Sequence, residues 1–121
     1  MAAWLQSALV LDNLSSNDYN RRMFSLKALP EFDAWLSGVR DRQTRFKLLR
    51  RLEKVQRGLL GDVAPVGDGV FEMREFFGPG WRMYYVQQKD IIIVMLGGGD
   101  KSSQVTDIAK AKSLASNLKE F

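Results

Sequence analysis

The sequence predicts an α+β domain in the order β-α-α-β-β-β-α, with a mostly antiparallel sheet, a helical hairpin and a C-terminal helix. Apolar residues recur at helical spacing between residues 30 and 57, alternate with polar residues around a Gly-Pro-Gly turn, and return to helical spacing after residue 102. The chain has 121 residues and is 45% hydrophobic, which suits one domain with one core. We expect this domain to span residues 23–121.

The first segment, residues 1–22, differs in character from the rest of the chain. We expect it either to form an accessory amphipathic helix or to lie upstream of a true start at Met23. After Met23, apolar residues alternate with Ser25 and Lys27. This alternation predicts a short strand.

A hairpin of two helices is predicted between residues 30 and 57. Pro30 suits the first turn of the first helix, because the N–H that it lacks would have no partner there. Asp41 is expected to cap the second helix, which ends at Gly58 and Gly61. The apolar positions of the two helices are Phe32, Trp35, Leu36, Val39, Leu48, Leu49, Leu52 and Val55.

Three strands are predicted after the helices, at residues 70–77, 81–87 and 90–96. Residues 59–69 are rich in Gly, Pro and Asp, which predicts a loop before them. The third strand is apolar on both faces, so we expect it inside the sheet.

The first two of these strands are expected to form a hairpin around a three-residue Gly78–Gly80 loop. In that register Phe77 opposes Trp81, and Arg74 opposes Tyr84. One face then carries Glu72, Arg74, Arg82 and Tyr84, and the other carries Phe71, Met73, Trp81, Met83 and Tyr85.

The last helix is predicted to come after a glycine-rich turn. Gly97–Asp100 is expected to end the third strand, and Ser102 or Ser103 can cap the helix. The helix presents apolar residues at Val105, Ile108, Ala111, Leu114, Leu118 and Phe121.

Composition excludes several kinds of site. The chain has no Cys and no His, so it has no disulfide, no thiolate zinc site and no imidazole base. No acidic spacing suggests a Mg²⁺ or Ca²⁺ site, and we expect neither a metal nor a cofactor. No apolar run approaches the roughly 18 residues of a membrane span, and no secretory signal is evident. A cytoplasmic protein without membrane contact is therefore expected.

Positive charge is concentrated in the second helix. The whole chain carries a net charge of +4, while residues 39–57 contain eight basic and two acidic residues. Four of the basic residues are spaced to share a helical face and are candidate RNA-binding residues: Lys47, Arg50, Arg51 and Lys54. Such a stripe would bind phosphates without reading sequence. The alternative is the solvated outer face of an ordinary amphipathic helix.

Two other features suit phosphate binding. Arg74, Arg82 and Tyr84 on facing strands can clamp a phosphate and stack a base; alternatively, the arginines pair with Glu72 and Glu75. The segment GGGDKSSQ combines backbone N–H groups, a helix N-terminus and a lysine, although a plain strand-to-helix turn would use the same glycines.

Five motifs resemble a known family. They lie at residues 35–42 (WLSGVRDR), 61–70 (GDVAPVGDGV), 72–74 (EMR), 77–84 (FGPGWRMY) and 96–108 (LGGGDKSSQVTDI). In this order, and over roughly residues 29–112, the chain resembles addiction-module killer proteins of the RelE/ParE superfamily, in the HigB-like, phage-derived branch.

The resemblance implies the toxin of a type II toxin–antitoxin system with a RelE/ParE-like fold. Its partners would be a cognate helix-turn-helix antitoxin, the ribosome and mRNA, with operator DNA bound only through the antitoxin complex. Many relatives are endoribonucleases that cleave mRNA on the ribosome, which is the activity we expect. Relatives on the ParE side inhibit DNA gyrase without catalysis, and a degenerate antitoxin-binding or nucleic-acid-binding module is a third alternative.

The resemblance also implies a set of catalytic residues: Arg74, Arg82, Tyr84, Lys101 and Asp107. Arg74 matches an arginine at the RNA-cleavage site of nuclease members, and Lys101 takes the basic position after the last strand. In this reaction a ribose 2′-OH attacks the adjacent phosphate, and Arg74 and Lys101 would stabilise the developing charge. The base that accepts the 2′-OH proton is left open among Asp107, Asp100, Lys101 and Tyr84. The helix dipole would also favour an acid at Asp107.

Overall fold

The structure is a computed structural model that describes residues 23–118. The described chain is α+β, as predicted, with a five-stranded sheet and three α-helices. Its elements are β1 (Ser25–Ala28), α2 (Pro30–Ser37), α3 (Arg42–Gln56), β2 (Val63–Gly67), β3 (Val70–Arg74), β4 (Trp81–Gln88), β5 (Ile92–Asp100), a 3₁₀ turn (Lys101–Ser103) and α4 (Gln104–Ser116). The predicted N-terminal extension, residues 1–22, and Phe121 of the predicted last helix lie outside the described residues.

The strand order in the sheet is β1-β5-β4-β3-β2. Strand β1 pairs with β5 in parallel, and the other neighbours are antiparallel. The prediction of a mostly antiparallel sheet is therefore confirmed. The prediction that residues 90–96 lie inside the sheet is also confirmed, because β5 has a partner on each side.

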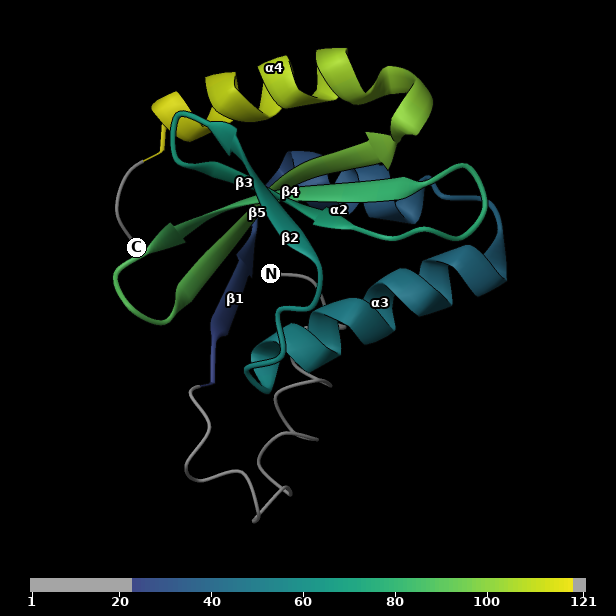
Figure 1. The fold of residues 1–121 in the computed structure, drawn as a ribbon, viewed down its shortest axis with the longest axis horizontal. Helices are drawn as coiled ribbons and strands as arrows, with labels where there is room; N and C mark the ends of the chain where they lie inside the picture. Colours follow the sequence, from purple (N-terminus) through teal and green to yellow (C-terminus); the bar gives the residue numbers. More distant parts are fainter. Residues whose placement is uncertain (1–22, 119–121) are drawn as a thin grey trace.

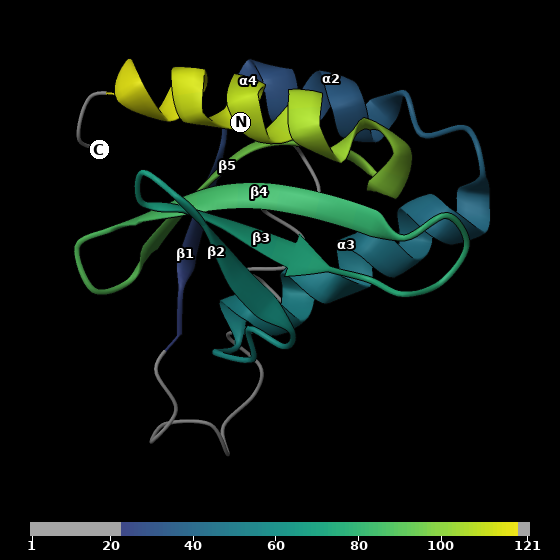
Figure 2. The same ribbon diagram turned by 45° about the horizontal axis from the view of Figure 1, so that its top comes forward.

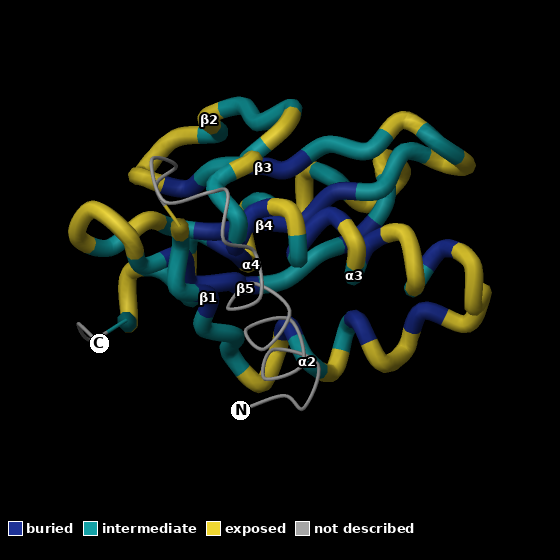
Figure 3. The backbone as a smooth tube through the Cα atoms, turned by 90° about the horizontal axis from the view of Figure 1, so that it is seen from below, coloured by how far each residue is buried: buried dark blue, intermediate teal, exposed yellow. Residues whose placement is uncertain are grey.

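Helices cover both faces of the sheet. Figures 1 and 2 show α4 on one side of the sheet and α3 on the other. Each face has its own buried cluster. Leu26, Phe32, Leu36, Val39, Leu48, Leu52, Val55, Met73, Met83, Tyr85, Ile93 and Met95 form the first, and Val70, Tyr84, Val94, Leu96 and Ala111 form the second. Along α3, buried and exposed turns of the backbone alternate (Figure 3), as expected for an amphipathic helix.

The predicted cap of α3 is confirmed. Asp41 accepts hydrogen bonds from the Thr44 backbone N–H at 2.9 Å and from its hydroxyl at 2.8 Å. These two hydrogen bonds lower the pKa of Asp41 below its ordinary value. The cap therefore fixes the first turn of α3.

The predicted element order is wrong by one strand. The predicted loop at residues 59–69 contains β2, which pairs with β3 and forms the edge of the sheet. Pro65 is compatible with this position, since an edge strand leaves one row of N–H groups without a ladder partner. A register irregularity between Pro65 and Gly67 further obscures the alternation in the sequence.

The predicted hairpin register is wrong by two residues. Arg74 opposes Arg82, and Glu72 opposes Tyr84, because residues 75–80 form a longer connection than the predicted three-residue loop. A shift of two keeps every side chain on its predicted face. Met73, Met83 and Tyr85 accordingly lie in one cluster and Tyr84 in the other.

The glycine run does not end the last strand. Gly97, Gly98 and Gly99 belong to β5, which continues to Asp100. A Cβ at Gly98 would overlap the Trp35 ring, and a Cβ at Gly99 would overlap the Asp107 carboxylate. These two glycines therefore allow close packing of α2 and α4 on the strand.

Two further expectations about α4 are corrected. Asp100 accepts the hydrogen bond from the Ser102 backbone N–H, whereas Ser103, the residue before the helix, makes no capping hydrogen bond. Val105 was expected on the apolar face but is 85% exposed. No helix within residues 23–118 has the length and apolar character needed to cross a bilayer.

Candidate nucleic-acid interface

A groove of about 830 Å³ runs between α3 and the C-terminal end of β3. Cationic and aromatic side chains dominate its lining. The lining residues include Phe46, Lys47, Arg50, Arg51, Lys54, Leu59, Asp62, Arg74, Glu75, Phe76 and Phe77. The groove therefore brings all four predicted RNA-binding residues and one predicted catalytic residue, Arg74, to one place.

Three of the predicted RNA-binding residues form an exposed cationic stripe. Lys47, Arg50 and Lys54 are all exposed on α3, at spacings of three and four residues that place them on one helical face. Within residues 23–118, none of them has a carboxylate within ion-pair distance. Their charges are available to an anionic ligand.

Arg51 departs from the predicted stripe. Its side chain is only 7% exposed, and it bonds to Glu75 at 2.6 Å. Its guanidinium also donates to the backbone carbonyls of Leu60, Asp62 and Arg74 at 2.8 to 3.1 Å. Because its guanidinium donates to groups within the protein, Arg51 stabilises the wall of the groove and is not available to a ligand. Helical spacing alone could not separate it from its exposed neighbours.

Arg74 lies at the rim of the groove with a carboxylate partner. Its guanidinium donates to Asp62 Oδ1 at 2.8 Å, and both side chains are more than one third exposed. This hydrogen bond lowers the pKa of Asp62 and raises that of Arg74. The sequence offered Glu72 and Glu75 as alternative partners of the arginines, but Arg74 pairs with Asp62.

Phe76 was not identified from the sequence as a site residue. It is 73% exposed, in the connection between β3 and β4. Its ring centroid lies 5.9 Å from Arg74 Cζ and 5.8 Å from Arg82 Cζ, within cation–π range. The sequence did offer one signal: two consecutive phenylalanines stand next to the Gly78–Gly80 turn, where a large apolar side chain can be left exposed.

Arg82 is buried on the α4 side of the sheet. Its Nε lies 3.6 Å from Glu72 Oε1, and each side chain is less than one tenth exposed. Glu72 also accepts a hydrogen bond at 2.8 Å from Gln104 of α4. Of the two sequence interpretations for Arg82, the structure has the ion pair with Glu72, and this pair is buried.

Tyr84 is fully buried in the α4-side cluster. Burial, followed by the charge of the nearby Glu72 carboxylate, raises the pKa of Tyr84 well above its ordinary value. A buried phenol that stays protonated at neutral pH has no phenolate with which to accept a proton, and its burial keeps it from reaching a ribose. This environment argues against Tyr84 as the proton acceptor.

Lys101 and Asp107 lie at the end of β5. Lys101 is exposed, and its Cβ borders Gly80, as does Nη1 of Arg82. Asp107 is half-buried against Gly99 and accepts a hydrogen bond from Ser103 Oγ at 2.5 Å. Hydrogen bonds from Ser102 lower the pKa of Asp100, which weakens that carboxylate as a base. Neither Lys101 nor Asp107 lines the groove.

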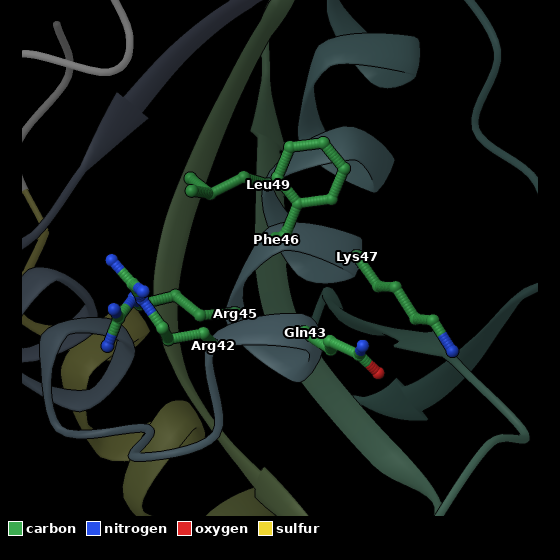
Figure 4. Close-up of a pocket in the computed structure, with 6 residues that line it drawn as sticks. All are labelled: Arg42, Gln43, Arg45, Phe46, Lys47 and Leu49. Atoms are coloured by element: carbon green, nitrogen blue, oxygen red, sulfur yellow. The ribbon is translucent and has the colours of Figure 1, made fainter.

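A second hollow of about 730 Å³ adjoins the groove on the N-terminal half of α3. Its lining includes Phe46 and Lys47, which also line the groove. Figure 4 shows Arg42 and Arg45 on one side of the helix and Lys47 on the other. Arg42 is thus an exposed cation on α3 that lies outside the groove.

Comparison with known proteins places the chain in a family. No protein-family profile and no solved structure matches it. An uncharacterized protein of Haemophilus influenzae is 40% identical over 93 residues, which cover 77% of this chain and 94% of that protein. The chain belongs to the same protein family as this Haemophilus influenzae protein.

Proposed function

We propose that this protein is the toxin of a type II toxin–antitoxin system and a ribosome-dependent mRNA endoribonuclease of the RelE/ParE type. One observation carries the proposal: the groove joins the exposed cations of α3 to Arg74, the residue that matches a cleavage-site arginine in the resemblance. The ordered motifs over roughly residues 29–112 support it from the sequence. Its partners would be the ribosome, mRNA and a cognate helix-turn-helix antitoxin, all in the cytoplasm.

In the proposed reaction the protein acts through positioning and charge. Lys47, Arg50 and Lys54 hold phosphates along α3. The 2′-oxygen of a ribose attacks the neighbouring phosphorus and loses its proton, while the bond from phosphorus to the 5′-oxygen breaks and that oxygen gains a proton. The products are a 2′,3′-cyclic phosphate and a 5′-hydroxyl. Arg74 stabilises the charge that develops on the phosphate oxygens, and the resemblance assigns the same role to Lys101, which lies outside the groove lining.

The environment of Arg74 supports charge stabilisation as its role. Arg74 remains protonated at every pH at which RNA is handled, because its hydrogen bond to Asp62 raises its pKa further. The same bond fixes the direction of the guanidinium, and a preorganised cation stabilises a developing anion without reorganising at the moment of reaction.

The test is induced expression of the full chain in bacteria, followed by primer extension on an abundant translated mRNA. We expect growth arrest with new 5′ ends in register with codons, both lost in Arg74→Ala. Arg42→Ala is the matched control, because it removes an exposed cation of α3 outside the groove. Equal soluble amounts of the variants are checked on the same cultures.

Two results would contradict the proposal. Growth arrest without new RNA ends would indicate a different target, such as gyrase. Normal growth with abundant soluble protein would indicate a binding module without toxic activity. Cleavage that persists in Arg74→Ala would remove Arg74 from the catalytic residues.

A further inference from the structure

We propose that Phe76 is a stacking platform for an unpaired base, and that the groove binds single-stranded RNA directly, without the ribosome. The inference rests on the proposed function for the identity of the nucleic acid as RNA. It adds a binding residue and the class of RNA, namely single-stranded. A duplex keeps its bases stacked on one another, so it would not present a base to this ring.

The first support is the exposure of aromatic rings in the groove. Of the large hydrophobic residues exposed in the described part of the chain, Phe46, Leu59 and Phe76 all line this one groove. Phe46 and Phe76 are 60% and 73% exposed. Exposed apolar residues gathered in one concavity mark a binding surface.

The second support is the way in which Phe76 is held. The neighbouring Phe77 is half-buried, its ring lies 4.5 Å from Lys47 Nζ, and its carbonyl accepts a hydrogen bond from Gly80 N–H at 3.1 Å. Gly80 takes a φ of 82° in this turn, which favours glycine. One phenylalanine therefore anchors the connection while the other projects into solvent.

The third support is the pairing of Phe76 with two guanidinium groups. Arg74 and Arg82 lie within cation–π distance of its ring, and each arginine has its own carboxylate partner, Asp62 and Glu72 respectively. Positive charge therefore lies beside the exposed ring at two positions. Arginine next to an aromatic platform adds cation–π attraction to the stacking of a base.

The fourth support is the charge pattern along the groove. Phe46 and Phe76 stand at different walls, and the exposed cations of α3 lie on the same lining. The two carboxylates of the groove, Asp62 and Glu75, are already bound by Arg74 and Arg51. Cations for phosphates and aromatic rings for bases are the combination with which proteins bind single strands without reading sequence.

The experiment measures binding of a fluorescently labelled, unstructured RNA oligonucleotide to the purified full chain by anisotropy, against the same sequence in a duplex. We expect the single strand to bind more tightly than the duplex. Phe76→Leu keeps an apolar side chain but removes the ring, and should weaken single-strand binding by about 5- to 150-fold, the range for loss of one stacked base. Phe76→Trp should retain binding, and Val105→Ala, at an exposed apolar position on α4, should leave it unchanged.

Salt dependence gives a second readout from the same samples. For a single strand, the logarithm of the association constant falls against the logarithm of salt concentration with a slope of about −0.7 per phosphate contact. Contacts by Lys47, Arg50 and Lys54 predict a slope of about −2. Lys54→Ala should make that slope shallower by about 0.7, whereas Phe76→Leu should leave it unchanged.

The outcomes separate this inference from the proposed function. Tighter binding of the duplex, or equal binding by Phe76→Leu and the unmodified protein, would overturn the inference even if ribosomal mRNA is cleaved in cells. No binding of the single strand would overturn it as well, and would leave the groove to a partner of another kind, such as an acidic peptide. Single-strand binding that depends on Phe76, without any cleavage in cells, would support the inference and contradict the nuclease.

Discussion

Arg51 and Glu75 form an ion pair of 2.6 Å that ties α3 to the connection between β3 and β4. The guanidinium of Arg51 also donates to three backbone carbonyls, two in the segment just before β2 and one at the end of β3. The pair therefore fixes the distance between the two walls of the groove. Arg51, one of the four residues that spacing indicated as RNA-binding, instead holds the two walls of the groove together.

We predict that Arg51→Met destabilises the protein by about 3 to 5 kcal/mol, because it leaves a half-buried carboxylate and several carbonyls without their donor. The measurement is urea unfolding followed by circular dichroism. Arg50→Met is the control, since Arg50 is exposed on the preceding position of α3, and its effect should stay within about 0.5 kcal/mol. Similar losses in both variants would show that Arg51 is no more structural than its neighbour.

A second prediction concerns the close approach of α4 to β5. Gly99→Ala would place a methyl group against the Asp107 carboxylate and Ser103 Oγ, and should cost about 1 to 3 kcal/mol of stability by overpacking. Gly97→Ala is the matched control in the same strand, because a Cβ at that position meets no atom within 4 Å. Urea unfolding of the two variants provides the comparison.

The cause is tested by combining Gly99→Ala with Asp107→Ala. If the carboxylate is what the new methyl group meets, the alanine at position 99 should cost less in this background, and the two effects should not add. Additive effects would place the origin of the strain elsewhere on the strand.

The sequence predicted the parts of the fold that depend on local periodicity. The α3 helix combines a capping aspartate with an apolar stripe, and the structure has both. Strand β2 escaped detection because Pro65 and Gly67 are typical of loops, and only pairing with β3 at the sheet edge makes them a strand. Gly98 and Gly99 were misinterpreted for a similar reason: their role depends on Trp35 and Asp107, which are distant in sequence.

In the candidate site, too, the sequence predicted what depends on local spacing and missed what depends on tertiary packing. Residue types and spacing indicated Lys47, Arg50 and Lys54 as an exposed basic face. Burial separates Arg51 from them and Tyr84 from the accessible residues, and burial depends on tertiary packing. The contribution of Phe76 depends on Arg74 and Arg82, which lie beside its ring. These two arginines oppose each other in the sheet, whereas the sequence predicted a register in which Arg74 opposes Tyr84.

A third prediction concerns the pairing of Asp62 with Arg74. The hydrogen bond holds the pKa of Asp62 below its ordinary value of 3.8, so the folded state favours the ionised carboxylate. The resulting stabilisation is present above the pKa of the unfolded chain and is lost as the pH falls through the lower folded pKa. NMR titration of the Asp62 carboxyl should give a depressed pKa that rises toward the ordinary value in Arg74→Ala.

Stability measurements against pH test the same linkage. Asp62→Asn should flatten the loss of stability below about pH 4, because the variant has no carboxylate to protonate there. Asp90→Asn, at an exposed aspartate whose side chain makes no ion pair within the described residues, should leave the acid limb unchanged. An Asp62 pKa that is the same with and without Arg74 would contradict the assignment.

The last prediction addresses the proton acceptor of the proposed reaction. Tyr84 is fully buried beside Glu72, and its pKa is raised, so it stays protonated and out of reach of a ribose. Tyr84→Phe keeps the ring that packs in the α4-side cluster, and we expect it to retain both fold and mRNA cleavage, whereas Arg74→Ala loses cleavage. Primer extension reports cleavage, and thermal unfolding reports the fold. If Tyr84→Phe abolished cleavage while its unfolding temperature stayed the same, Tyr84 would have to move to the surface during the reaction.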